Sequence, residues 1–160
     1  MRDQPERIPV VVAEESDDIV RRIARRIGEI VRGRRAAGKH AVLGLATGST
    51  PIGVYRELAR LHREEGLDLS DVVTFNLDEY FPMTPASLHS YHRFMRENLF
   101  EHVNIDPRNV HIPRGDLPRA EIEAHCREFE RAIEEAGGID FQLLGIGRRT
   151  APRGEATAAS

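Results

Sequence analysis

A short run of small and hydroxylated residues, Thr47, Gly48, Ser49 and Thr50, stands between an apolar run and a proline that can open a helix. The backbone N–H groups and hydroxyls of such a loop can point at an anion, and the positive end of the helix dipole favours negative charge there. Phosphate is the natural ligand. No Gly-Lys-Ser/Thr sequence follows, so a nucleoside triphosphate is disfavoured. The alternative is an ordinary strand-to-helix turn that Ser49 or Thr50 caps.

Two adjacent carboxylates, Asp78 and Glu79, follow a second apolar run and precede Tyr80. Side chains alternate along an extended chain, so we expect one carboxylate to enter a cleft while the other supports the loop. A carboxylate beside a bound sugar phosphate could move a proton between neighbouring carbons, and such general base catalysis contributes about 10²–10⁴-fold. An acidic pair in a loop is usually a solvated turn, but the position after a buried strand adds weight to the catalytic interpretation.

The remaining reactive side chains form no further site by their spacing. His89 and His92 stand three residues apart but lack a nearby third ligand, so no metal site is expected. Neither a Gly-x-Ser-x-Gly motif nor a Cys–His pair with a plausible triad is present. The single cysteine, Cys126, lies in a helical pattern and is expected at a helix–sheet boundary rather than as a nucleophile.

The elements that must position these residues can be read from the apolar spacing. Short apolar runs predict strands over residues 41–46, 72–77, 110–113 and 141–144, and helical periodicity begins near residues 16, 51, 88 and 122, with Ser16 as a helix N-cap. Strands that alternate with helices predict an α/β fold with a mostly parallel sheet. Functional residues should then lie at the carboxyl ends of the strands, where Gly145-Ile146-Gly147 forms a third candidate turn.

The bulk composition fits one domain. The chain has 160 residues, of which 40% are hydrophobic and 31% charged, enough for one core but not for two ordinary domains. Its apolar runs are far shorter than the roughly 20 residues that span a bilayer, and no secretory signal is visible. A lone cysteine fits a reducing compartment, so we expect a cytoplasmic protein. With a net charge of −3 and interleaved arginines and glutamates, no patch demands nucleic acid.

The end of the chain differs from the rest. From residue 149 onward the sequence has no periodicity and no large apolar residue, so it cannot bury enough surface to offset its ordering entropy. We expect one domain over residues 1–148 and an unstructured tail over residues 149–160.

Four short motifs occur in an order and spacing that indicate a family. They are Leu45-Ala46-Thr47-Gly48-Ser49-Thr50-Pro51, Val73-Thr74-Phe75-Asn76-Leu77-Asp78-Glu79-Tyr80, Ser90-Tyr91 and Leu143-Leu144-Gly145-Ile146-Gly147. Each is weak alone, but together they resemble the glucosamine-6-phosphate deaminase family over about residues 11–148. The related 6-phosphogluconolactonases share the sheet and a phosphate loop, and the string that ends at Tyr80 is more similar to the deaminases.

The resemblance implies a Rossmann-like three-layer α/β sandwich and an activity. Members convert an amino-sugar 6-phosphate to fructose 6-phosphate and ammonia, without a metal or an organic cofactor. By position, Thr47, Gly48, Ser49 and Thr50 would hold the phosphate. Asp78 would be the base that moves a proton between sugar carbons 2 and 1, and Glu79 would support it.

The sequence departs from the family after Gly147. In the family this turn leads to a glycine-histidine pair and an Asn-Glu-Pro string, and the histidine assists ring opening. Here Arg148, Arg149 and Thr150 follow, and the chain stops at Ser160. The resemblance therefore predicts a fold truncated at its C-terminus and little or no ammonia release. The abrupt change at Arg149 suggests a reading-frame slip, which resequencing would test.

Two other functions stay open. The chain could be a non-catalytic module that binds a sugar phosphate through the same loop, or a hydrolase similar to 6-phosphogluconolactonase. In each case the expected partner is a small sugar phosphate, not a membrane or nucleic acid. A sheet edge and apolar surface left uncovered by truncation could also support a homo-oligomer.

Overall fold

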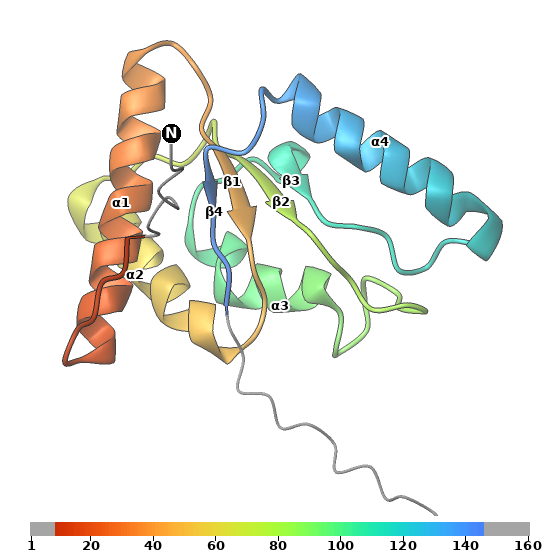
Figure 1. Ribbon diagram of the computed structural model, residues 1–160, viewed down its shortest axis with the longest axis horizontal. Helices are drawn as coiled ribbons and strands as arrows, with labels where there is room; N and C mark the ends of the chain where they lie inside the picture. The colour runs from red at the N-terminus through yellow and green to blue at the C-terminus, as the bar shows by residue number, and fades with distance from the viewer. Residues whose placement is uncertain (1–8, 146–160) are drawn as a thin grey trace, which may run out of the picture.

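The computed structural model describes residues 9–145, which form α-helices, parallel strands and three short 3-10 helices (Figure 1). The helices are α1 (Ser16–Ala36), α2 (Ser49–Glu65), α3 (Tyr91–Asn98) and α4 (Ile122–Glu135), and the strands are β1 (Val42–Leu45), β2 (Val73–Asn76), β3 (Val110–His111) and β4 (Phe141–Gln142). The 3-10 helices are η1 (Phe100–His102), η2 (Pro107–Asn109) and η3 (Arg119–Glu121). The tail expected over residues 149–160 lies outside the described residues, so that domain boundary stays a prediction.

The strands form one parallel sheet in the order β3-β2-β1-β4. A helix lies in each crossover between consecutive strands, as parallel pairing requires. Helices α1, α2 and α3 cover one face of the sheet, and α4 lies over the other face (Figure 1). The α/β class with a parallel sheet, predicted from the sequence, is therefore confirmed, and the layers number three.

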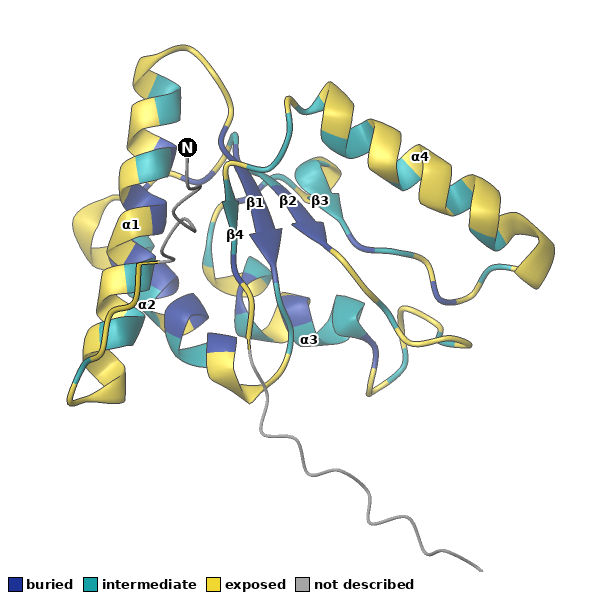
Figure 2. Ribbon diagram, in the orientation of Figure 1, coloured by how far each residue is buried: buried dark blue, intermediate teal, exposed yellow. Residues whose placement is uncertain are grey.

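The face under α1, α2 and α3 holds the main core. Spacings of three and four in α1 turn Ala24, Ile27 and Val31 toward the interior, where all three are buried. Leu58 of α2 and Met95 of α3 join the same core. Figure 2 shows the buried positions as dark blue segments on the sheet and on the inner sides of these helices. Each fully buried large side chain stabilises by about 1.5–3 kcal/mol, so this face anchors the strands.

The opposite face is attached to α4 through a small aromatic cluster of Phe75, His111 and Phe129. Phe75 of β2 is fully buried, and its ring stacks on His111 of β3 with the centroids 4.5 Å apart. Phe129 of α4 meets the Phe75 ring edge-on at 5.6 Å. None of the residues in α4 is fully buried (Figure 2). The cluster thus joins α4 to β2 and β3.

Two helix boundaries differ from the expected ones. The helix expected over residues 88–102 begins only at Tyr91, because Ser90 is its N-cap and accepts a hydrogen bond from the Arg93 N–H at 3.1 Å. Leu88 is exposed and belongs to the preceding loop. At the first helix, Ser16 is the first helical residue rather than the N-cap, and Glu15 occupies the N-cap position without a side-chain bond.

The strands are shorter than the apolar runs that predicted them, since the last residues of each run leave the ladder to enter the loops. Within residues 9–145, no helix has the length and apolar character needed to cross a membrane.

The aromatic cluster predicts a pH dependence of stability. Burial lowers the pKa of His111 below its ordinary value of 6.5, so the unfolded chain takes up a proton more readily than the folded chain. The contribution of His111 is complete above pH 6.5 and declines as the pH falls from there toward the lowered folded pKa. Urea unfolding of wild type between pH 7.5 and 5.5 should show this decline, and His111→Phe, which keeps a stacking ring, should flatten it. His89→Gln, at an exposed site, is the matched control; equal slopes for wild type and His111→Phe would contradict the prediction.

Candidate active site

Three loops meet beyond the carboxyl ends of β1, β2 and β4. They line a cavity of about 420 Å³ whose walls include Thr47 after β1, Asp78 after β2 and Gly145 after β4. A Cβ placed on Gly145 would lie 3.8 Å from the Cβ of Thr50 at the start of α2. The loops converge because the carboxyl ends of parallel strands share one edge of the sheet. Residues 146 and 147 of the expected glycine turn lie outside the described residues.

The loop after β1 leaves the start of α2 open to an anion. Gly48 occupies the N-cap position with φ 103° and ψ 177°, a conformation that glycine adopts readily and other residues rarely do. Ser49 and Thr50 are the first helical residues and are exposed, and no side chain caps the helix. The capping role that the alternative interpretation gives to Ser49 or Thr50 is therefore not seen. The first turn also holds no acidic residue, so free N–H groups and the helix dipole favour an anion there.

Tyr55 fixes the base of this loop from the second turn of α2. Its hydroxyl accepts a hydrogen bond from the Ala46 N–H at 3.1 Å and donates one to the Ala46 carbonyl. The Tyr55 side chain is fully buried, and burial raises the pKa of its hydroxyl well above the ordinary value. The residue before Thr47 is thereby held at both of its backbone polar groups.

A second clamp joins the ends of the two central strands. Leu45 of β1 pairs with Asn76 of β2, and the Asn76 Nδ2 donates to the Leu45 carbonyl at 3.2 Å. Asn76 is fully buried. The clamp fixes the distance between the two loops that carry Thr47 and Asp78.

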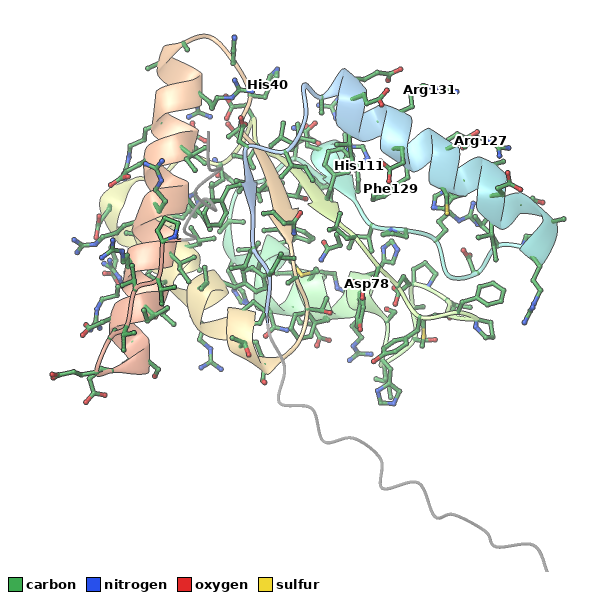
Figure 3. All side chains as sticks on the ribbon, in the orientation of Figure 1. His40, Asp78, His111, Arg127, Phe129 and Arg131 are labelled. Atoms are coloured by element: carbon green, nitrogen blue, oxygen red, sulfur yellow. The ribbon has the colours of Figure 1, made fainter. Side chains whose placement is uncertain are left out.

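Asp78 faces the cavity shared with Thr47. Its pKa is raised, first because the surrounding walls remove water from the carboxyl and second because Glu79 is negatively charged. A higher pKa strengthens a carboxylate as a base. Figure 3 shows Asp78 at the α3 end of the molecule, away from His40 at the opposite end of the sheet.

Glu79 turns away from the cavity toward α3. Its carboxylate accepts hydrogen bonds from the Tyr91 N–H at 2.9 and 3.1 Å and from the Tyr80 N–H at 2.9 Å. These contacts place a negative charge at the N-terminus of α3, where the helix dipole favours it. Asp78 and Glu79 thus point in different directions, and Glu79 ties the loop after β2 to the helix that follows.

Tyr91 also lines the cavity. It occurs in one of the motif strings of the sequence, where it was given no role. Its ring lies 4.9 Å from the Tyr80 ring, centroid to centroid. The pKa of the Tyr91 hydroxyl is raised, chiefly by its hydrogen bond with Tyr80 and then by burial. The available signal was an aromatic residue directly after Ser90, at the start of a helix that follows the carboxylate loop.

Tyr55 and Asn76 were also missed as site residues. From the sequence Tyr55 was given no role, and Asn76 appeared only within the string that ends at Tyr80. A buried hydroxyl or amide near a strand end usually bonds to a backbone group. This rule could have indicated that Tyr55 and Asn76 hold the strand ends in place.

Other reactive groups do not form a site among the described residues. No cluster of three or more His, Cys, Asp or Glu side chains within residues 9–145 could hold a metal ion. Cys126 is exposed on α4, so the expectation that it lies at a helix–sheet boundary is wrong. α4 is held by Phe129 instead, which leaves Cys126 on a flank of the helix.

A larger hollow than the loop cavity, of about 860 Å³, lies along α1. Its arginines include Arg21, which pairs with Asp18 at 2.7 Å, and Arg26, which pairs with Glu29 at 3.1 Å. Because these charges are exposed and partly neutralised within one helix, the surface fits the solvated face expected from the sequence better than a binding site.

Comparison with known proteins gives a consistent match. Residues 14–149 match the family model described as glucosamine-6-phosphate isomerases/6-phosphogluconolactonase. The chain is 46% identical over 138 residues to glucosamine-6-phosphate deaminase 2 of Bacillus subtilis, covering 86% of the chain and 53% of that relative. It is 53% identical over 136 residues to glucosamine-6-phosphate deaminase 2 of Giardia intestinalis, covering 85% and 49%. The chain thus spans about half the length of the curated relatives it matches.

Solved structures show the same relationship. A monomeric glucosamine-6-phosphate deaminase superposes with a TM-score of 0.81 at 37% identity, covering 88% of this chain and 56% of that one. A 6-phosphogluconolactonase from Thermotoga maritima superposes with a TM-score of 0.66 at 27% identity, covering 86% and 58%.

The Tyr55 clamp gives a prediction about stability. Tyr55→Phe removes both bonds to Ala46 and leaves its backbone groups without a protein partner, which should cost about 1–3 kcal/mol of unfolding free energy. Tyr80→Phe removes a hydroxyl bonded to Tyr91, but on a side chain that is 54% exposed, where water can replace the partner, and should change stability by less than about 0.5 kcal/mol. Urea unfolding measures both; a Tyr55→Phe protein as stable as wild type would contradict the clamp.

Glu79 gives a prediction about the pKa of Asp78. Glu79→Gln keeps an oxygen that can accept from the Tyr91 N–H but removes the negative charge that raises the pKa of Asp78. The Asp78 pKa should therefore fall, as measured by carbon-detected NMR titration of its carboxyl group. Glu123→Gln, exposed on α4, is the control. If the Asp78 pKa stays the same or rises in Glu79→Gln, the assigned electrostatic coupling is wrong.

Proposed function

The chain belongs to the family of glucosamine-6-phosphate isomerases and 6-phosphogluconolactonases, and from this we propose that it binds an amino-sugar 6-phosphate and takes part in its deamination. The substrate is glucosamine 6-phosphate, and the products of the whole reaction are fructose 6-phosphate and ammonia. The observation that carries the proposal is that Asp78 and Thr47, the residue before the Gly48 N-cap of α2, line one cavity.

The phosphate belongs at the open end of α2. The N–H groups of Ser49 and Thr50 and the hydroxyls of the loop provide donors, and Gly48 adds no side chain that would block the approach. No lysine or metal is needed for this mode of binding, because the helix dipole and backbone donors already favour an anion.

Asp78 is the general base. Once the phosphate is anchored, carbons 1 and 2 of the open sugar chain lie toward the opposite wall of the cavity. The carboxylate takes the proton from carbon 2 and returns it to carbon 1, while solvent carries a proton from the amino nitrogen to the carbon-1 oxygen. The amino aldose thereby becomes the isomeric imine at carbon 2, and addition of water to this imine releases ammonia and leaves the ketose. The raised pKa of Asp78 supports this role, because the protonated acid must persist long enough to return the proton.

Glu79 and Tyr91 act through position. Glu79 holds the N-terminus of α3 and thereby the loop that carries Asp78. Tyr91 closes the wall between Asp78 and Thr47. In this proposal neither residue transfers the proton.

Lactone hydrolysis is the second candidate function. It is favoured by one observation, the similarity of the fold to a 6-phosphogluconolactonase at 27% identity. Hydrolysis of 6-phosphogluconolactone by the purified chain, without proton exchange on a ketose phosphate, would support it over the deaminase proposal.

Exchange of a sugar carbon-bound hydrogen with solvent measures the proton transfer assigned to Asp78 separately from ammonia release. Fructose 6-phosphate in D₂O should exchange a carbon-1 hydrogen in the presence of the chain, and Asp78→Asn should slow this exchange by about 10²-fold or more while its affinity for the sugar phosphate stays within a fewfold of wild type. Proton NMR measures the exchange, calorimetry measures the affinity, and Glu123→Gln is the control.

The outcomes separate the possible functions. Exchange that depends on Asp78 supports the deaminase chemistry, and ammonia release from glucosamine 6-phosphate reports the complete reaction. Binding without exchange in wild type would favour a non-catalytic module. Exchange that Asp78→Asn leaves unchanged would show that another group is the base.

A further inference from the structure

Gly44 at the centre of β1 makes room for a polar side chain from the neighbouring strand. Gly44 pairs with Gln142 of β4 on one side and with Phe75 of β2 on the other. A Cβ on Gly44 would overlap the Oε1 and Cδ atoms of Gln142 and would lie 2.8 Å from its Nε2. The amide of Gln142 therefore lies across β1, in the space that any other residue at position 44 would fill.

The Gln142 amide has hydrogen-bonding capacity left over. Its Nε2 donates one hydrogen bond, to the Leu143 carbonyl at 3.0 Å, and an amide nitrogen carries two donor hydrogens. Within residues 9–145 no protein donor bonds to the Oε1 atom. Gln142 is half-buried, and among the described residues its carbonyl oxygen and its second amide hydrogen have no protein partner.

Gln142 also lines the cavity that Thr47 and Asp78 line. We propose that Gln142 contacts the substrate and contributes to its specificity by hydrogen bonding to a hydroxyl group of the sugar chain. This inference rests on the proposed function. An amide suits the task because it can both donate to and accept from a hydroxyl, and it adds no charge beside a phosphate and a carboxylate.

The position of Gln142 indicates which part of the sugar it contacts. Thr47 marks the phosphate end of the cavity and Asp78 marks carbons 1 and 2. Gln142 enters from β4, on the other side of β1 from Asp78. Because Gln142 and Asp78 approach from opposite sides of β1, the amide contacts hydroxyls away from the reacting carbons 1 and 2, such as those on carbons 3 and 4.

Calorimetric titration of the purified chain tests the contact. Gln142→Leu keeps the approximate size of the side chain and removes its hydrogen bonds, so the affinity for glucosamine 6-phosphate should fall about three- to tenfold. The affinity for inorganic phosphate, which lacks the hydroxyls, should change by less than about twofold. Gly44→Ala, which displaces the amide while Gln142 remains, should produce a similar selective loss.

The control is Phe141→Leu, a change in the same strand at a side chain that packs against the main core and not toward the cavity. It should lower stability while leaving the ratio of the two affinities unchanged. The 3-deoxy and 4-deoxy analogues of glucosamine 6-phosphate then identify the hydroxyl. Wild type should lose affinity for one of them, and Gln142→Leu should bind that analogue as well as it binds glucosamine 6-phosphate.

The failures are distinguishable. If wild type binds glucosamine 6-phosphate and Gln142→Leu binds it equally well, the contact is refuted while the proposed function stands. If Gln142→Leu loses affinity for inorganic phosphate to the same extent, the effect is general and the specificity role is refuted. If wild type binds phosphate but gains nothing from the sugar, both the inference and the proposed substrate fail.

Discussion

The site depends on the pairing of two short parallel strands at their carboxyl ends. Leu45 and Asn76 are paired in the ladder and joined again by the Asn76 amide, so the loops that start after them leave the sheet from fixed points. One loop runs into the open end of a helix and the other carries a carboxylate. With this pairing in place, Thr47 and Asp78 line one cavity; a register shift of one residue would turn the Asp78 side chain to the other face.

The helices stabilise the arrangement unequally. The face under α1, α2 and α3 holds most of the fully buried side chains, and two of these helices also serve the site: Tyr55 reaches from α2 to hold Ala46, and the N-terminus of α3 is held by Glu79. On the other face, α4 contacts the sheet through an aromatic cluster. Substitutions in α2 and α3 are therefore expected to affect both stability and the site, whereas substitutions on the outer side of α4 should affect neither.

Much of this could be predicted from the sequence, and the limits have physical causes. Apolar periodicity gave the order of strands and helices, and parallel topology placed Thr47 and Asp78 at one edge. The spacing of the motifs also indicated the family. Periodicity alone could not identify Tyr55, Asn76 or Gln142, because it treats an inward side chain as apolar filling and does not show which backbone group or empty space a polar tip reaches. The role of Gly44 depends on a neighbouring strand almost 100 residues later in the chain, a pairing that local sequence cannot reveal. The helix over residues 88–102 was drawn too long because the Ser90 cap outweighs the apolar spacing around it.

The central claim is that an anchored phosphate at the start of α2 presents the sugar to Asp78. A crystal structure of the chain with bound fructose 6-phosphate tests it most directly. We expect the phosphate oxygens within hydrogen-bonding distance of the N–H groups of Ser49 and Thr50, and the Asp78 carboxylate within about 3.5 Å of carbon 1 or 2. A phosphate bound elsewhere, or a sugar chain that leads away from Asp78, would contradict the account.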